Sequence, residues 1–370
     1  MTGVPALVVC SLEEWDEVWR RNQFLADGLL RRDPRLRILF VEPPADPLHD
    51  LSVRRRPRAL RVRRLRDDGR LWALRPLKPL PRRAGPLGDA LLRGQVLLAA
   101  RLLRLPSPLL WLNDVTYAPL IEATGWPAVY DVTDDWLRAP ASRRELDRLR
   151  TLDELALATA QEVVVCSEDL ARSRGARRKV SLVPNAVDAA HFQRPTTRPA
   201  DLPEGPVAVY VGSLHDSRLD VELVVELARE LPELSIALVG PDALSAEARS
   251  LLRSGARVTL LGPRPYHAVP AYLQHADVLV VPHRVTPFTE SLDPIKAYEC
   301  LAVPTPTVAT PVAGFRELDG LVTLAGRDGF VAAVRTVLAG GGPSASRPTL
   351  PSWDDRATEF GAILERAARR

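Results

Sequence analysis

Short runs rich in aliphatic and β-branched residues alternate with helical patterns along the whole 370-residue chain. This alternation predicts parallel sheets covered by helices on both faces, because parallel strands need a crossover between them. In the first half we expect strands at residues 6–11, 36–42, 109–114, 128–133, 162–167 and 180–185. The expected helices between them cover residues 14–32, 86–105 and 141–160.

A Pro-rich stretch, QRPTTRPADLPEGP at 193–206, interrupts this alternation and is typical of a linker. The pattern then restarts, with strands expected at 207–213, 235–241, 258–263 and 278–283, and helices at 219–231 and 245–254. The fold class is therefore α/β, with two doubly wound, Rossmann-like domains. Their expected bounds are 1–192, then the linker at 193–206, a second domain at 207–350, and a terminal segment at 351–370 that packs back on the first domain as a helix.

Composition places the chain among ordinary globular proteins. Hydrophobic residues make up 46% and charged residues 26%, and the net charge is only +4. The six histidines show no metal-ligand spacing with acids or cysteines, and nothing indicates a nucleic-acid partner. Cys10, Cys166 and Cys300 are far apart and read as reduced thiols. With no leader or membrane span visible, we expect a cytoplasmic protein.

Residues 54–66, RRRPRALRVRRLR, hold eight arginines and no acid. Like-charge blocks are usually solvated or partly disordered, so an arm between strands is the first interpretation. The second is a patch that attracts an anionic membrane surface or acceptor, giving peripheral membrane contact.

Ligands of open α/β sheets bind beyond the carboxyl ends of the strands. The first strand of the second domain leads into VGSLHDSR, where Gly212 and Ser213 permit close backbone approach and Arg218 can pair with phosphate. His215 is a further possible contact in this loop. Neither this loop nor the first strand's loop has the GxGxxG fingerprint, which counts against an NAD or FAD enzyme.

Two later loops add candidates. LGPRPY at 261–266 presents Arg264 from a rigid backbone, either to a planar base or as a surface arginine on a β-turn.

In DPIKAYECLA at 293–302, Asp293 is expected as the N-cap, Pro294 as the first helical residue and Lys296 at about the third position. A cation there opposes the helix dipole, so a bound diphosphate would explain it, with Glu299 holding a ribose. The alternative is an ion pair between Lys296 and Glu299.

Several stretches together are similar to family-four glycosyltransferases of GT-B fold, in particular the bacterial polysaccharide and teichuronic-acid-type branch. They are YVGSLHDSRLDVELVVELARELPELSIALVGP, VTLLGPRPYHAVPAYLQHADVLVVPHR, DPIKAYECLAVPTPTVAT, CSLEEWDEVWRRNQFLADGL, ILFVEPP, VYDVTDDW and VPNAVDAAHF. The resemblance spans most of the chain. It implies two domains facing a central cleft and a retaining, metal-independent transfer from a nucleotide-diphosphate sugar, with no other cofactor.

By position, Glu299 matches the second glutamate of the family's E-x7-E motif and would hold the ribose. Lys296 and Arg218 would neutralise the diphosphate, and Arg264 would lie near the base. The expected donor-binding set is Gly212, Ser213, His215, Arg218, Arg264, Ser291, Asp293, Pro294, Ile295, Lys296 and Glu299.

The chain departs from the family pattern twice. Ser291 stands where the first glutamate of the motif is expected. Where many relatives carry a histidine, this chain reads DVTDDW, so Thr133, Asp134 and Asp135 are the expected catalytic residues. Helix N-capping is the structural alternative for this acidic pair.

The leading hypothesis is a glycosyltransferase acting on a glycan, a lipid-linked molecule or a small natural product. Two alternatives stay open: a nucleotide-sugar epimerase or hydrolase of the same fold, and a degenerate nucleotide-sugar-binding protein. The base, the sugar, the acceptor and the oligomeric state are left open by the sequence.

Overall fold

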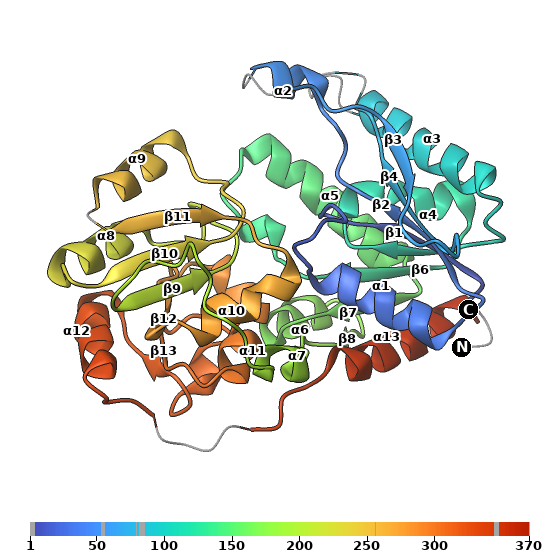
Figure 1. Ribbon diagram of the computed structural model, residues 1–370. Helices are drawn as coiled ribbons and strands as arrows, with labels where there is room; N and C mark the ends of the chain where they lie inside the picture. The colour runs from blue at the N-terminus through green and yellow to red at the C-terminus, as the bar shows by residue number, and fades with distance from the viewer. Residues whose placement is uncertain are drawn as a thin grey trace.

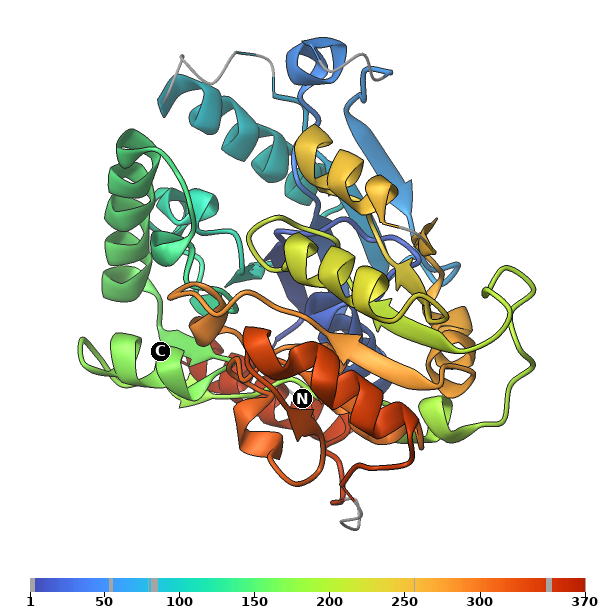
Figure 2. The same cartoon turned by 90° about the vertical axis from the view of Figure 1, so that its left-hand side faces the viewer.

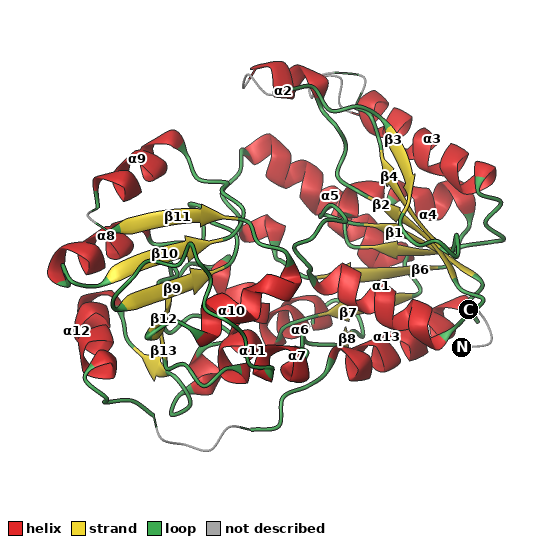
Figure 3. Ribbon diagram, viewed as in Figure 1, coloured by secondary structure: helices red, strands yellow, loops and turns green. Residues whose placement is uncertain are grey.

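Two separate sheets lie side by side in the computed structural model, which describes residues 4–52, 56–78, 80, 86–255, 257–343 and 348–369 (Figures 1 and 3). The first has the strand order β3-β4-β2-β1-β5-β6-β7-β8 and the second β11-β10-β9-β12-β13-β14. Helices flank both sheets, so the prediction of two doubly wound sheets is confirmed. Figure 2 shows the second sheet in front of the first.

The first sheet is parallel except at one edge, where β3 pairs antiparallel with β4. Its strands are β1 (Ala6–Cys10), β2 (Arg37–Val41), β3 (Arg61–Arg64), β4 (Leu71–Arg75), β5 (Leu109–Leu112), β6 (Ala128–Val132), β7 (Glu162–Val165) and β8 (Ser181–Leu182). Its helices are α1 (Arg21–Arg32), α2 (Pro47–Ser52), α3 (Pro86–Leu102), α4 (Pro119–Thr124), α5 (Arg143–Thr159) and α6 (Glu168–Gly175).

The second sheet is parallel throughout the described pairs. Its strands are β9 (Val207–Val211), β10 (Ser235–Val239), β11 (Val258–Gly262), β12 (Val278–Val281), β13 (Thr307–Ala309) and β14 (Thr323–Leu324). The remaining helices are α7 (Ala189–Gln193), α8 (Val221–Glu230), α9 (Ala246–Ser254), α10 (Val269–Gln274), α11 (Ile295–Ala302), α12 (Arg327–Leu338) and α13 (Trp353–Ala368).

Helix α1 begins at Arg21, later than the expected start at residue 14. Residues 11–20 instead form a loop, because two of their tryptophans are held by aromatic neighbours: Trp15 contacts Phe40 at a centroid distance of 5.1 Å, and Trp19 contacts Phe24 at 5.2 Å. The helical periodicity of this stretch therefore reflects packing of a loop onto the core.

The arginine-rich segment is more ordered than expected. Residues 54 and 55 lie outside the described part, but β3 pairs with β4, and acids from other elements neutralise several side chains. Arg58 contacts Glu14 at 3.1 Å and Arg63 contacts Glu42 at 2.5 Å. The interpretation as a disordered arm is therefore wrong for the strand itself.

The sequence patterns also missed short elements. Strands β13 and β14 have three and two residues, too few to show a period of two. Strand β4, LWALR, and helices α2, α4, α6, α7 and α10 were not anticipated either, since all of them are short. Helix α12 was also missed, although Phe330, Val334 and Val337 follow a helical spacing.

The chain crosses between the domains twice, and the crossings lie side by side. The backbone N–H of Val187 donates to the carbonyl of Pro351 at 3.1 Å. From Val187 onward the first crossing packs in the core under the second sheet, together with Phe192 and Leu202. After the second crossing, α13 packs on α1 in the first domain, where Trp353 stacks on Phe24 at 4.6 Å.

Helices α1 and α13 approach closely at Gly28, where a Cβ atom would lie 2.6 Å from the Cβ of Ala357. We expect Gly28→Ala to lower the free energy of unfolding, because overpacking costs about 1–3 kcal/mol and exceeds the roughly 0.5–1 kcal/mol that alanine gains in a helix. Thermal and urea unfolding measure the change. The control is Gly94→Ala in α3, whose Cβ would meet nothing within 4 Å, so that variant should be as stable as the wild type or more so. Equal effects of the two substitutions would contradict the close approach.

Candidate active site

The start of helix α11 is held against the first domain by buried polar contacts. The Asp293 carboxylate accepts the backbone N–H of Asn185 at 2.5 Å and the hydroxyl of Tyr298 at 2.9 Å. Asn185 in turn accepts from Arg21 at 3.1 Å, and Arg21 pairs with Asp131 at 3.2 Å, both almost fully buried. This network, which we call the interdomain network, fixes where α11 begins.

Asp293 is therefore not the N-cap that the sequence predicts. Pro294 occupies the cap position with extended backbone angles, the helix starts at Ile295, and Lys296 is its second residue. The Asp293 carboxylate turns away because Asn185 and Tyr298 compete for it, and burial raises its pKa. Ile295 packs against the core of the first domain, and the ring of Pro294 lies against Gly314.

The Lys296 ammonium is held by two side chains from the second sheet. It donates to the hydroxyl of Tyr210 at 2.6 Å and contacts His283 Nε2 at 3.1 Å, and it lies 4.2 Å from the centroid of the Tyr210 ring. Burial, followed by the charges of Lys296 and Arg218, lowers the pKa of His283 well below its usual value, so the imidazole is neutral and accepts from the lysine.

Gly212 makes room for this ammonium. Its φ is 147°, and a Cβ there would lie 2.5 Å from Lys296 Nζ. Glycine is thus required at the loop after β9 for a steric reason as well as a conformational one. The sequence analysis singled out Gly212 but missed Tyr210 and His283. The position of His283, at the end of an expected strand, was the signal that could have found it.

Glu299 lies one turn after Lys296 on α11. Burial raises the pKa of its carboxyl to about 7, and the positive charge of Lys296 opposes the shift only in part. The salt-bridge interpretation of this pair is not what the structure shows: the described ion pairs do not include Lys296 with Glu299, and the ammonium points to Tyr210 and His283 instead.

Arg218 extends from the second domain to the first. Its guanidinium donates to the Asp134 carboxylate at 3.0 Å and lies over the ring of Phe288, 5.4 Å from the centroid. Thr133, next to Asp134, accepts from the Asn113 side chain at 3.0 Å. The loops after β5, β6 and β9 therefore meet at Arg218.

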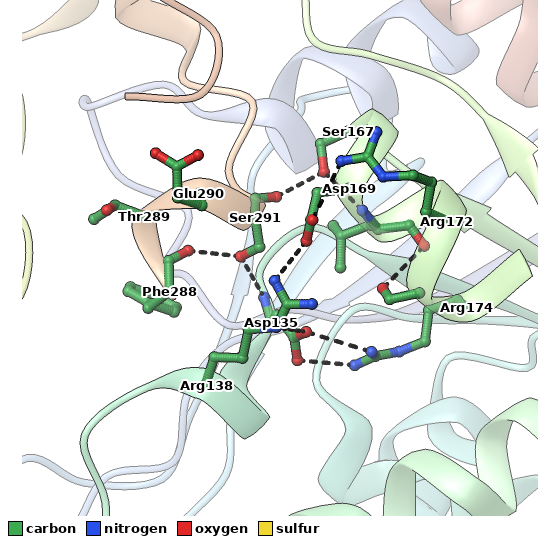
Figure 4. A network of polar contacts seen from close by, with 12 residues as sticks. Asp135, Arg138, Ser167, Asp169, Arg172, Arg174, Phe288, Thr289, Glu290 and Ser291 are labelled. Atoms are coloured by element: carbon green, nitrogen blue, oxygen red, sulfur yellow. Dashed lines mark hydrogen bonds and ion pairs between the residues drawn. The ribbon is translucent and has the colours of Figure 1, made fainter. Parts of the chain in front are cut away.

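Asp135 and Ser291 also come together, but as a contact between domains and not in an open site (Figure 4). The buried Asp135 carboxylate pairs with Arg174 at 3.0 Å and with Arg138 at 3.1 Å. Its backbone N–H donates to Ser291 Oγ at 3.3 Å, and the carbonyl of Ser291 accepts from Ser167 at 2.7 Å. Of the expected catalytic and donor-sugar residues, Asp135 and Ser291 are thus engaged in bonds within and between the domains.

Three other residues were expected to contact the donor: Arg264, His215 and Ser213. Arg264 is engaged by Asp201 of the linker and by the hydroxyl of Tyr272, 2.7 Å away. His215 is exposed and accepts from the Ser217 hydroxyl at 2.8 Å. Ser213 is exposed too, and its carbonyl accepts from Tyr210 at 3.4 Å. The structure brings none of these three to Lys296 through a described side-chain contact.

A cavity of about 280 Å³ opens in the first domain beside Asp134. We call it the first-domain cavity. It is lined by Leu12, Asn113, Asp114, Val115, Thr116, Tyr130, Val132, Thr133, Asp134, Trp136, Leu137, Glu145, Leu149, Asp153 and Arg174.

Glu13, in the loop after β1, was also missed. Burial raises its pKa to about 7, an effect opposed by Arg20, whose Nε lies 3.7 Å away.

The described residues provide neither a metal site nor a membrane-spanning helix. No cluster of three or more His, Cys, Asp or Glu side chains there is arranged to hold a metal ion. Among the same residues, no helix combines the length and the apolar character needed to cross a membrane.

Comparison with known proteins supports the resemblance stated above. Residues 205–340, which hold most of the second domain, match the family model described as "Glycosyl transferases group 1". A Bacillus subtilis (strain 168) protein, named as the teichuronic acid biosynthesis glycosyltransferase TuaH, is 29% identical over 220 residues. That alignment covers 54% of this chain and 55% of the relative, so the chain matches only about half of that relative's length.

Solved structures confirm the GT-B fold. Sucrose-phosphate synthase from Thermosynechococcus elongatus superposes with a TM-score of 0.69 at 20% identity, covering 98% of this chain and 96% of the other. Anabaena HepE, in complex with UDP and glucose, gives a TM-score of 0.64 at 15% identity and 98% and 99% coverage. At such identities the likeness is one of fold.

The raised pKa of Glu299 predicts how stability depends on pH. Between the usual pKa of about 4.5 and the folded value of about 7, the folded protein keeps a proton that the unfolded chain has lost, so Glu299 makes stability fall as pH rises through this window. We expect Glu299→Gln to gain about 1–3 °C in melting temperature over the wild type between pH 5 and pH 8. The control is Glu230→Gln, at the exposed end of α8. Its melting temperature should differ from that of the wild type by the same amount at every pH in this range. A difference for Glu299→Gln that does not grow with pH would contradict the assignment.

Proposed function

We propose that this protein transfers a sugar from a nucleoside-diphosphate sugar to an acceptor bound on the first domain. One observation carries the proposal: the Lys296 ammonium is held between Tyr210 and His283 at the start of α11, next to the loop that bears Arg218. This arrangement lies within residues 205–340, the range that matches the group 1 glycosyltransferase model, and that match supports the proposal.

Departure of a nucleoside diphosphate leaves negative charge that preorganised cations stabilise. Lys296 and Arg218 supply two such charges, and the backbone N–H groups of the first turn of α11 point the same way. Because Tyr210 and His283 fix the lysine before the donor arrives, little reorganisation is needed in the transition state. The neutral imidazole matters here, since a protonated His283 would repel the ammonium.

The remaining roles follow from position in the cleft. Glu299, one turn along α11, would accept hydrogen bonds from the ribose hydroxyls. Asp134 would orient the acceptor hydroxyl, and the departing phosphate would take its proton, so that transfer retains configuration without a metal ion. Binding of the donor diphosphate would compete with Asp134 for Arg218.

The epimerase or hydrolase alternative would consume the nucleotide sugar without an acceptor. The degenerate binding protein would bind it and release no nucleoside diphosphate. Measuring diphosphate release with and without acceptor separates these two from the transferase.

The first test is a thermal-shift screen with UDP, GDP, dTDP and ADP and their common sugar conjugates. UDP comes first because the HepE structure was solved with it. A ligand that binds only the native state stabilises it by about 2.7 kcal/mol at a hundredfold excess over its Kd. We expect one base to raise the melting temperature of the wild type, and Lys296→Ala to lose most of that rise.

Lys179→Ala is the matched control, since Lys179 is an exposed lysine between α6 and β8. It should keep the full shift. Equal shifts in Lys296→Ala and the control would contradict the diphosphate site.

We further propose that the protein works at the cytoplasmic face of a membrane, through a surface formed by α2, β3 and α3. Figures 1 and 2 both place these elements at the upper end of the first domain. Eight large apolar side chains are exposed there: Leu48, Leu51, Leu60, Val62, Leu87, Leu91, Leu98 and Leu102. Arg56, Arg61 and Arg64 are exposed beside them. We call these residues the leucine-arginine surface.

Charge complementarity favours an anionic bilayer as the partner of this surface. Leucines spaced by four and seven residues share one side of α3, as in helices that lie in a membrane interface. Arg56, Arg61 and Arg64, for which the described part of the chain shows no ion pair, add attraction to anionic lipids. The three cysteines are buried and no disulfide joins them, which is consistent with a reducing compartment.

Replacing Arg56, Arg61 and Arg64 together by glutamine should weaken cosedimentation with vesicles that contain phosphatidylglycerol by at least about tenfold, because each arginine near the surface contributes roughly 1 kcal/mol. Replacing Arg229, Arg253 and Arg335, which are exposed on helices of the second domain, is the matched control and should change binding little. Equal loss in both triple variants, or equal binding to pure phosphatidylcholine, would contradict this surface.

A further inference from the structure

We propose that the first-domain cavity binds an uncharged or amine-bearing acceptor with an apolar ring face, and that Asp114 selects it. This inference rests on the proposed function, since it names the acceptor class of the same reaction. Of the acceptors left open above, the inference favours an uncharged or amine-bearing molecule and excludes an anionic, phosphate-bearing one.

The position of the cavity suits an acceptor. It lies at the carboxyl ends of β5 and β6 and is closed on one side by α5, which contributes Glu145 and Leu149. At its other side is Asp134, whose carboxylate is 3.0 Å from Arg218 of the proposed donor loop. A hydroxyl held beside Asp134 would therefore border the donor.

The walls of the cavity are largely apolar. Leu12, Val132, Leu137 and Leu149 supply aliphatic surface. The Trp136 side chain is 39% exposed and lies 5.5 Å from Phe288 of the second domain, so one of its edges is supported while it remains accessible at the cavity. Aromatic rings of this kind pack against the apolar face of a sugar or another ring. A volume of about 280 Å³ is near the lower limit of small-molecule sites, enough for one or two rings.

The charges that line the cavity exclude an anion. Four carboxylates and a single guanidinium, that of Arg174, face it. Arg174 is already paired with Asp135 at 3.0 Å and with Asp153 at 3.4 Å. The arginines just outside are engaged as well: Arg148 with Asp89 at 2.7 Å and Arg218 with Asp134. A phosphate or carboxylate entering the cavity would lose its hydration without gaining a free cation.

Asp114 is the carboxylate with capacity to spare. One of its oxygens accepts the backbone N–H of Thr116 at 2.9 Å, which caps the short helix Val115–Tyr117. In the part of the chain that the structure describes, no lysine or arginine forms an ion pair with it, although Arg148 is near enough to act on its charge. Burial raises the pKa of Asp114, and hydrogen bonds from the backbone N–H and the side chain of Thr116 oppose the shift. An acceptor ammonium would supply the cationic partner that the described residues do not give this carboxylate, and an acceptor hydroxyl would add a further hydrogen bond.

The test uses three aryl glycosides that differ mainly in charge: 4-nitrophenyl β-D-glucosaminide, β-D-glucoside and β-D-glucuronide. Each is titrated into the full chain and followed by calorimetry, without a donor. We expect the amine and the neutral glycoside to bind at least about tenfold more tightly than the glucuronide. Asp114→Asn should remove the advantage of the amine over the glucoside, since asparagine can still cap the short helix but carries no charge.

Two further variants keep the test sharp. Asp147→Asn is the matched control, because Asp147 is a 56% exposed acid on α5, the helix that closes one side of the cavity, and does not itself line the cavity. It should leave all three affinities unchanged. Trp136→Ala should weaken all three by similar factors.

Three outcomes would overturn the inference: glucuronide binding as tight as that of the glucosaminide, an unchanged order in Asp114→Asn, or no binding of any glycoside at millimolar concentration. The same samples are titrated with UDP. A UDP response that depends on Lys296, together with failure of the glycosides, would defeat the acceptor inference alone. Glycoside binding without any nucleotide response would defeat the proposed transferase instead.

Discussion

The interdomain network is the constraint on which the site depends. The Arg21–Asp131 ion pair is buried in the first domain, where such a pair is costly unless its remaining bonding capacity is used. The Asn185 side chain accepts a further hydrogen bond from Arg21, and the backbone N–H of Asn185 donates to Asp293, which precedes α11. Because α11 carries both Lys296 and Glu299, the orientation of these two side chains relative to the first domain is set by contacts that begin inside that domain. Removing any one side chain of the interdomain network would deprive its buried polar neighbours in the network of a hydrogen-bond partner.

The loops of the two domains that meet at Arg218 differ in charge. On the second domain, Lys296 and Arg218 concentrate positive charge, and a neutral His283 avoids adding to it. On the first domain, carboxylates predominate around the first-domain cavity. An anionic donor and a neutral or cationic acceptor would therefore each be steered to its own side. The ion pair between Arg218 and Asp134 neutralises one charge from each side at this boundary.

Most of the fold could be predicted from local pattern, because long alternating runs specify parallel strands and their crossovers. The site could be predicted only where a residue was unusual for its position, as with Lys296 in the first turn of a helix. Asp293 was misassigned because its partner, Asn185, is 108 residues away. His283 and Tyr210 were missed because a buried histidine and a strand tyrosine also occur as ordinary core residues. The strand Arg61–Arg64 was missed because the acids that neutralise it come from other elements.

The adjacent crossings at Val187 and Pro351 have a mechanical consequence. Two chain segments that leave a domain at separate points resist rotation about most axes, whereas segments bonded to each other at one point act as a single pivot. Asn185 is two residues from this pivot, so its bond to Asp293 has a short lever arm and survives a small rotation. Contacts farther from the pivot would be stretched in proportion to their distance. In any rotation about this point, the Asn185–Asp293 bond would therefore change least, and bonds far from it would change most.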